Sequence, residues 1–256
     1  MFINRFGSGS RVFFGLHGWS GTHDSFAPLT ARLPEGVTLY CADMPGYGRS
    51  AAPREWSLRA IAQEISGAIS SIDAPSVTVI GNCSGAIFGL LAAEQARERV
   101  ERFVLIDPFA FVPWYFNLFV ARSWGRYAYN STFANPVGRW VTNLSLRRRR
   151  AEGSDLTRSF KSVNHDTAYR YLELMSGIGG VSRFRDLRAP VDIVYGERTF
   201  DAVKKSVAMW QALWPHARAF ELKGAGHLPI DEATDRLSEI AFTARKDLAH
   251  RVSILC

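Results

Sequence analysis

Val77-Thr-Val-Ile-Gly81-Asn-Cys83-Ser-Gly85-Ala-Ile-Phe-Gly89 is the most informative stretch of this 256-residue chain. It reads as a β-branched strand, then the pattern Gly-x-Cys-x-Gly, then an apolar helix. A residue on a sharp turn from a strand into a helix has a strained backbone, and the residues two before and two after it crowd each other. Gly81 and Gly85 therefore place Cys83 at such a turn.

A cysteine at this turn is a candidate nucleophile. Amide N–H groups at the start of a helix lower the pKa of a thiol beside them, and the thiolate is the reactive form. Most free cysteines are buried as small apolar side chains, but the glycine register favours a nucleophile at Cys83. Ser84 does not fit the same register, because Asn82 would then occupy a crowded position. Cys41, inside a predicted strand, and Cys256, the last residue, lack this setting.

Short strand-like runs alternate with longer stretches of helical spacing along the chain. The spacing of apolar residues predicts helices over 57–71, 86–96 and 204–213. Strands that alternate with helices predict an α/β fold, with a mostly parallel sheet covered on both faces. The predicted strands are 11–16, 38–42, 76–80, 102–106, 191–195 and 217–222.

The region 109–188 breaks this alternation, because it is rich first in aromatic residues and then in arginine. We expect it to form a mostly helical cap inserted into a sheet domain made of 1–108 and 189–256. The cap should cover the edge where the parallel strands end, since open α/β sheets bind ligands there. Its aromatic first part, with Trp114, Tyr115 and Phe116, is expected to line an apolar substrate pocket.

Four motifs, in order along the chain, resemble those of the α/β-hydrolase superfamily. The turn at 81–85 is similar to the family's nucleophile elbow. The chain departs from most relatives in having Cys83 where they have serine; dienelactone hydrolases, polyhydroxyalkanoate synthases and some thioesterases share this feature. The other three motifs are His17-Gly-Trp-Ser-Gly21, similar to the oxyanion loop, Asp43-Met-Pro-Gly-Tyr-Gly-Arg-Ser50, similar to the D-x-P-G-x-G-x-S segment, and Gly224-Ala-Gly-His227-Leu-Pro, similar to the catalytic-histidine loop.

The resemblance implies a role for each candidate site residue. Cys83 would be the nucleophile and His227 its general base. The backbone N–H groups of Trp19 and Ser84 would form the oxyanion hole. His17 belongs to the oxyanion loop and is expected to be structural.

The acidic partner of the histidine is open between several residues. The family usually places it three residues after the glycine that follows strand 191–195, and that position is Thr199. Asp201, two residues further on, is the first choice. Asp107, at the end of the preceding strand, is the alternative, although an aspartate there also suits a strand end and the next turn. Glu197, or a Cys–His pair without an acid, also stays open.

The net charge of +7 comes entirely from the cap. The cap has 13 basic and five acidic residues, a net charge of +8, so the rest of the chain carries −1. A solvated arginine-rich surface is the simplest interpretation. The charge also suits an acidic acyl carrier protein or coenzyme A as partner. Nucleic acid is not expected, because the aromatic residues precede the basic run and do not alternate with it.

Composition excludes several protein classes. With 47% hydrophobic and 21% charged residues, the chain is neither disordered nor fibrous. No apolar run is long enough for a membrane span, and the N-terminus lacks a signal-peptide layout, so we expect a cytoplasmic protein.

The three cysteines fit neither a disulfide framework nor a zinc site, and neither a metal nor a cofactor is expected.

These features together predict an acyl-transfer enzyme. It would be a hydrolase or an acyltransferase that acts on an ester or thioester through an acyl group on Cys83. The alternative is a non-catalytic or ligand-binding protein of the same fold, because the usual position of the acid holds Thr199.

Overall fold

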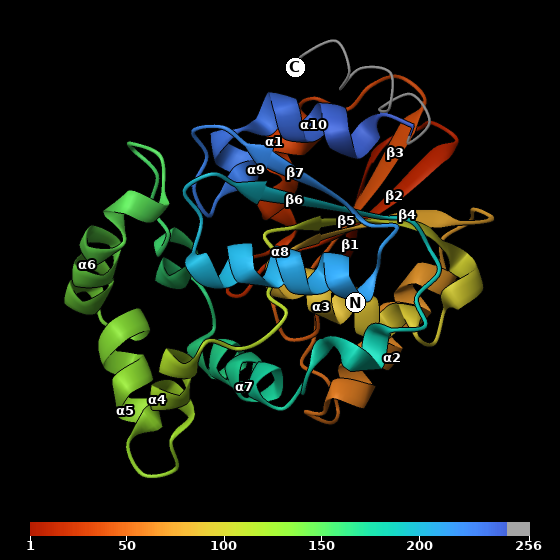
Figure 1. Cartoon of the computed structure of the whole chain (residues 1–256). Helices are drawn as coiled ribbons and strands as arrows, with labels where there is room; N and C mark the ends of the chain where they lie inside the picture. The colour runs from red at the N-terminus through yellow and green to blue at the C-terminus, as the bar shows by residue number, and fades with distance from the viewer. Residues whose placement is uncertain (245–256) are drawn as a thin grey trace.

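Seven strands form one sheet at the centre of the molecule (Figure 1). The computed structural model describes residues 1–244. The strand order is β1-β3-β2-β4-β5-β6-β7, and each neighbouring pair is parallel except β1 and β3. The predicted α/β fold is therefore confirmed. The strands are β1 (Ile3–Gly7), β2 (Arg11–Leu16), β3 (Val37–Ala42), β4 (Val77–Asn82), β5 (Val100–Ile106), β6 (Val191–Gly196) and β7 (Arg218–Leu222).

Strand β1 is the one that the sequence did not predict. It pairs antiparallel with β3, with Ile3 opposite Ala42 and Gly7 opposite Thr38. As an edge strand it is only partly buried, so it lacks the continuous apolar run of the central parallel strands. The other six strands lie within two residues of their predicted bounds.

Helices cover both faces of the sheet, as Figure 1 shows. The predicted helices 57–71, 86–96 and 204–213 correspond to α2, α3 and α8, which share one apolar core against the sheet. Helices α1, α9 and α10 pack on the other face. The bounds are α1 (Ala27–Thr30), α2 (Leu58–Ser70), α3 (Ser84–Ala93), α8 (Asp201–Leu213), α9 (Pro229–Glu232) and α10 (Thr234–Phe242).

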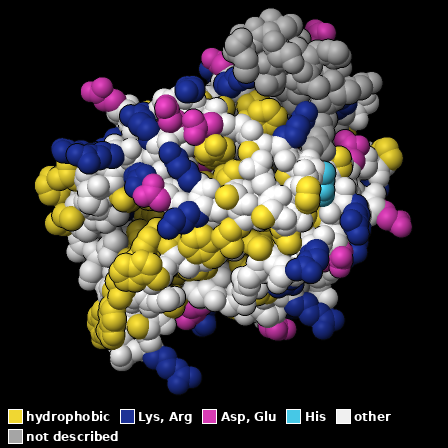
Figure 2. All heavy atoms as spheres, viewed as in Figure 1, with side chains coloured by type: hydrophobic (Ala, Val, Ile, Leu, Met, Phe, Trp, Pro, Cys, Tyr) yellow, Lys and Arg dark blue, Asp and Glu magenta, His cyan; other side chains and the backbone are white. Residues whose placement is uncertain are grey.

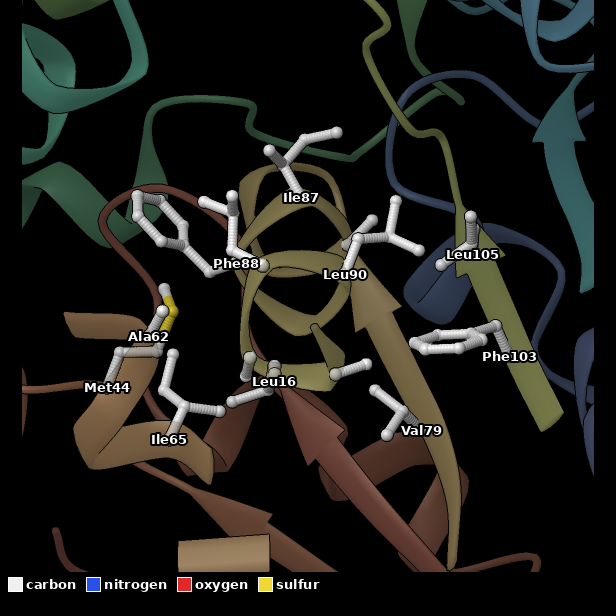
Figure 3. Close-up of a cluster of buried hydrophobic side chains, with 14 of the residues drawn as sticks. Leu16, Met44, Ala62, Ile65, Val79, Ile87, Phe88, Leu90, Phe103 and Leu105 are labelled. Carbon is white, nitrogen blue, oxygen red and sulfur yellow. The ribbon is translucent and has the colours of Figure 1, made fainter. Parts of the chain in front are cut away.

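The strands contribute alternate side chains to the two cores. Along β5, Phe103 and Leu105 join the core beneath α2 and α3, whereas Val104 and Ile106 join the core on the opposite face. Figure 3 shows Phe103 and Leu105 on the same side of the sheet as Leu90 of α3. Successive side chains of a strand point to opposite faces, so a strand buried on both sides needs an unbroken hydrophobic run.

Every element described between β5 and β6 is helical. Trp19, from the loop after β2, is a central contact for this segment. Its ring packs against Phe116, Phe133 and Phe160, and its Nε1 donates to the carbonyl of Ala168 at 2.7 Å. No helix within residues 1–244 is both long and apolar enough to cross a membrane. The elements are η3 (Trp114–Phe116), α4 (Asn117–Val120), α5 (Gly125–Tyr129), η4 (Asn130–Ala134), α6 (Pro136–Ser145), η5 (Arg147–Arg149), η6 (Arg158–Lys161), α7 (His165–Ser176) and η7 (Val181–Phe184).

Candidate active site

Cys83 lies at the turn between β4 and α3 with a φ of 50° and a ψ of −113°, which is strained for a residue other than glycine. A Cβ atom on Gly81 would lie 2.4 Å from Cα of Ala86. A Cβ atom on Gly85 would lie 2.2 Å from the carbonyl oxygen of Leu16. Each glycine is therefore required by a close backbone approach, the first at the start of α3 and the second at the end of β2.

The imidazole of His227 is held by a carboxylate from β5. Its Nδ1 lies 2.7 Å from Oδ2 of Asp107, the residue that directly follows β5. The hydroxyl of Thr199 donates to the same carboxylate oxygen at 2.6 Å, and the backbone N–H of Gly196 donates to Oδ1 at 3.1 Å. Asp107 is fully buried and has a φ of 46°. These contacts fix the carboxylate and, through it, the orientation of the ring.

The charge state of His227 follows from its neighbours. Burial lowers the pKa of an imidazole, because it disfavours the charged ring. Hydrogen bonds to the side chains of Asp107 and Cys83, and the charges of both groups, act in the opposite direction and raise the pKa of His227 to about 10. The site therefore favours the imidazolium form, which is the form that can give a proton to a leaving group.

Asp201, the first-choice acid, does not occupy this position. It is exposed at the start of α8, and its two carboxylate oxygens accept from the guanidinium of Arg149 at 3.0 and 2.8 Å. Glu197 is also directed elsewhere, because it accepts from the backbone N–H of Gly224 at 2.7 Å. Asp107, the alternative, is the residue that contacts His227. Thr199 occupies the position where the resemblance leads us to expect the acid, and its hydroxyl donates a hydrogen bond to Asp107.

The two backbone groups expected to form an oxyanion hole lie beside Cys83. Ser84 is the first residue of α3, and N–H groups in the first turn of a helix have no partner inside that helix. A Cβ atom on Gly18 would lie 3.2 Å from Cβ of Cys83, so the loop that carries Trp19 passes next to the thiol. The backbone N–H of Trp19 has no hydrogen-bond acceptor within residues 1–244.

His17 supports this loop. Its Nε2 accepts from the backbone N–H of Met44 at 3.0 Å, and its Nδ1 lies 2.8 Å from the carbonyl of Gly18. Complete burial lowers the pKa of His17 to about 4. A neutral imidazole that is hydrogen-bonded at both nitrogens ties the loop to the segment that follows β3, and it is not free to exchange protons with a substrate.

An apolar cavity of about 680 Å³, including its open mouth, adjoins Cys83. Of the three expected pocket residues, Phe116 lines it, whereas Trp114 and Tyr115 do not. Trp114 is instead 74% exposed. The three residues form a single short turn of helix, so their side chains point in different directions. The apolar lining includes Trp19, Ile87, Phe109, Phe111, Leu172, Met175, Ile178, Phe184 and Trp210.

Several site residues were not identified from the sequence. The rings of Phe109 and Phe200 pack against the imidazole of His227, with centroids 5.7 and 4.7 Å away. Thr199 joins the network only because Asp107 comes from the neighbouring strand. Phe109 follows Asp107 by two residues, so the strand end was a signal that could have pointed to it. The cavity residues from α7, η7 and α8 carry no motif.

Comparison with known proteins fits this geometry. The model of the alpha/beta hydrolase family matches residues 13–240. The chain belongs to the alpha/beta hydrolase family. It is 26% identical over 235 residues to the pimeloyl-[acyl-carrier protein] methyl ester esterase of Klebsiella pneumoniae subsp. pneumoniae, a match that covers 84% of this chain and 86% of that protein.

Two solved structures show that this member of the family has the same fold along almost its whole length. A thermophilic esterase from Thermogutta terrifontis superimposes with a TM-score of 0.75 at 17% identity, over 93% of this chain and 90% of that one. The enol-lactonase from Burkholderia xenovorans LB400 superimposes with a TM-score of 0.72 at 16% identity, over 93% and 94% of the two chains.

Proposed function

We propose that this family member is an acyl-transfer enzyme, an ester or thioester hydrolase or an acyltransferase, in which Cys83 carries the acyl group. The observation behind the proposal is the position of Cys83. It lies at the strained turn and lines the apolar cavity, and its side chain helps to raise the pKa of a histidine that Asp107 orients. The relative that is 26% identical is named an esterase, which supports the same class of reaction.

In the first half of the reaction the acyl group moves to sulfur. Nδ1 of His227 is bound to Asp107, so Nε2 is the nitrogen that takes the proton of the Cys83 thiol, and this transfer produces the imidazolium form that the site favours. The sulfur attacks the carbonyl carbon of the substrate, a C–S bond forms, and the carbonyl electron pair moves to oxygen. The N–H groups of Trp19 and Ser84 would bind that oxyanion. The bond to the leaving alcohol or thiol then breaks, and His227 supplies the proton.

In the second half an acceptor removes the acyl group. His227 takes a proton from the acceptor, whose electron pair attacks the thioester carbon, and the C–S bond breaks to release Cys83. Water as acceptor gives hydrolysis, whereas an amine or alcohol gives transfer. Thioesters react more readily with amines and carbanions than oxygen esters do. A cysteine therefore gives transfer a modest advantage over hydrolysis.

The cavity limits the class of acyl group. Among residues 1–244 no charged side chain lines it, so a charged acyl terminus would lose its hydration without gaining an opposite charge. An uncharged hydrocarbon chain suits this lining. We therefore propose an apolar acyl group.

An acyl group on a carrier is a second candidate substrate. The observations that favour it are the net charge of +8 over residues 109–188 and the name of the Klebsiella relative, which acts on an acyl-carrier-protein ester. The same acyl group should then have a higher kcat/KM as a coenzyme A or carrier thioester than as a simple ester, and salt should remove the difference. Equal salt dependence for both substrates would contradict carrier docking.

The non-catalytic alternative rested on Thr199 at the usual position of the acid. The carboxylate of Asp107, 2.7 Å from Nδ1 of His227, supports the catalytic proposal instead. A protein that only binds ligands would keep the cavity and form no covalent intermediate. This difference provides the test.

The test is the intact mass of the protein after incubation with a panel of acyl thioesters and p-nitrophenyl esters. We expect a burst of product and one acyl group per chain, located on Cys83 by peptide mapping. Cys83→Ala should show neither the burst nor the adduct while keeping the unfolding temperature of the wild type. A folded wild-type protein with no adduct and no turnover on any member of the panel would overturn the proposal.

A further inference from the structure

Helix α6 exposes its apolar face. Val137, Trp140, Val141 and Leu144 recur at the i, i+3, i+4 and i+7 spacing of one helix face, and each is between 48% and 68% exposed. An amphipathic helix on the surface of a globular protein normally turns such a face toward the core. In α6 no residue is buried. The helix therefore presents to solvent the side that would be expected inside.

The polar side of α6 is held against the protein by specific contacts. The guanidinium of Arg139 donates to the carbonyls of Phe133 and Ala134 at 3.0 and 2.8 Å. The side-chain oxygen of Asn143 accepts from the backbone N–H of Leu156 at 3.1 Å. A Cβ atom on Gly138 would lie 1.8 Å from the carbonyl oxygen of Ser131, so the helix backbone itself approaches η4. The orientation of α6 is thus built into the segment.

The neighbouring helices extend this apolar surface. Contacts join η3 to α4, α4 to α5, α5 to η4 and η4 to α6, so these elements form one continuous layer. In Figure 2 hydrophobic side chains gather over the left-hand part of the molecule, where α4, α5 and α6 lie in Figure 1. Eight of the nine large hydrophobic side chains exposed within residues 1–244 belong to this layer, which we call the α4–α6 face: Trp114, Leu118, Trp124, Tyr127, Val137, Trp140, Val141 and Leu144.

The charge of the same segment has one sign. Residues 109–151 contain seven arginines and no aspartate or glutamate. Arg122, Arg147 and Arg148 are exposed and form no ion pair within residues 1–244. Arg122 lies shortly after α4, and the other two belong to η5, which begins two residues after the end of α6. Unpaired positive charge therefore adjoins the exposed aromatic and aliphatic side chains.

We propose that the α4–α6 face binds the surface of an anionic lipid bilayer. An apolar helix face with tryptophan, tyrosine and leucine enters the boundary between headgroups and acyl chains, and flanking arginines attract anionic headgroups. Trp114 and Tyr127, 74% and 77% exposed, combine an apolar ring with a polar N–H or O–H group, which suits that boundary.

Two other occupants fit less well. A second copy of the chain on the same face would bring equivalent arginines toward each other. An acidic carrier would satisfy the arginines but leave the apolar side of α6 in water. The face also adjoins the cavity, because Pro113 and Phe116 line the cavity on either side of Trp114 in the chain. Lipid binding does not depend on the chemistry proposed for Cys83.

The test is co-sedimentation of the full chain with vesicles. We expect binding to equimolar phosphatidylcholine and phosphatidylglycerol, weaker binding to phosphatidylcholine alone, and release by salt. The double variants Trp140→Ser/Val141→Ser and Arg147→Glu/Arg148→Glu should each weaken binding about tenfold or more. Met209→Ser is the matched control, since Met209 is the ninth exposed hydrophobic side chain and lies on α8.

Three outcomes would overturn the proposal. One is no binding to either kind of vesicle by a folded protein. The second is a dimer on gel filtration that Trp140→Ser/Val141→Ser converts to a monomer, which would assign the face to a second copy. The third is binding of an acidic carrier protein that both double variants abolish while vesicle binding is unchanged. Circular dichroism and thermal unfolding of each variant establish that the loss is local.

Discussion

Nδ1 of His227 lies 2.7 Å from Oδ2 of Asp107, although 120 positions separate the two residues in the chain. Asp107 comes from the end of β5, the strand next to the one that carries Cys83, and its carboxylate is also bound by the hydroxyl of Thr199 and the N–H of Gly196. This carboxylate contacts the imidazole at Nδ1, orients the ring and favours its charged form.

Asp107→Asn and Asp201→Asn should differ sharply in turnover. The first change removes the carboxylate charge that orients His227 and stabilises its protonated form, and we expect kcat to fall by about a thousandfold or more. The second removes only an exposed ion pair with Arg149, so kcat should stay close to that of the wild type. Steady-state rates on one p-nitrophenyl ester give the comparison. If Asp201→Asn lost the activity and Asp107→Asn kept it, Asp201 would be the acid.

Cys83 should be alkylated by iodoacetamide much faster than Cys41. Cys83 lines the cavity, whereas Cys41 is fully buried in β3, where burial raises the pKa of its thiol to about 12. Cys256 lies outside the described residues, so the experiment uses the Cys256→Ser background. Peptide mass mapping over time measures both rates. Comparable labelling of Cys41 in the folded protein would show that the two thiols do not differ as described.

The contribution of His227 to stability should depend on pH in a defined direction. Its pKa rises from 6.5 to about 10 in the folded chain, so the stabilisation is complete below pH 6.5 and is lost as the pH rises through 10. The difference in unfolding free energy between the wild type and Asp107→Asn should therefore shrink over that interval. Urea unfolding at several pH values measures it. If the difference in unfolding free energy between the two proteins grew as the pH rose, the raised pKa of His227 would be contradicted.

Gly81→Ala and Gly67→Ala form a matched pair. The new Cβ at position 81 would lie 2.4 Å from the backbone at Ala86, and overpacking of this kind costs about 1–3 kcal/mol. At position 67, in α2, nothing lies within 4 Å, so alanine should stabilise the helix by about 0.5–1 kcal/mol. Chemical denaturation gives both values. Equal effects at the two sites would mean that the close approach at the elbow is not required.

Features with a local cause were predictable. The Gly-x-Cys-x-Gly pattern located the turn because the close approach at Gly81 is to Ala86, five positions further along the chain. The close approach at Gly85 is to Leu16, so its cause became visible only in the folded chain. The central strands were recognisable because burial on both faces demands apolar residues at every position, as in Phe103 to Ile106. The edge strand β1 has no such demand, since it pairs on one side and is only partly buried.

Features that depend on distant segments needed the folded chain. Asp107 and Asp201 both lie near the ends of neighbouring strands, and only the packing of the two loops brings one carboxylate to His227 and directs the other to Arg149. The spacing of Val137, Trp140 and Leu144 is the same for a helix that faces the core and for α6, which faces away. Periodicity defines a face of a helix, but the contacts of Arg139, Asn143 and Gly138 decide which way that face points.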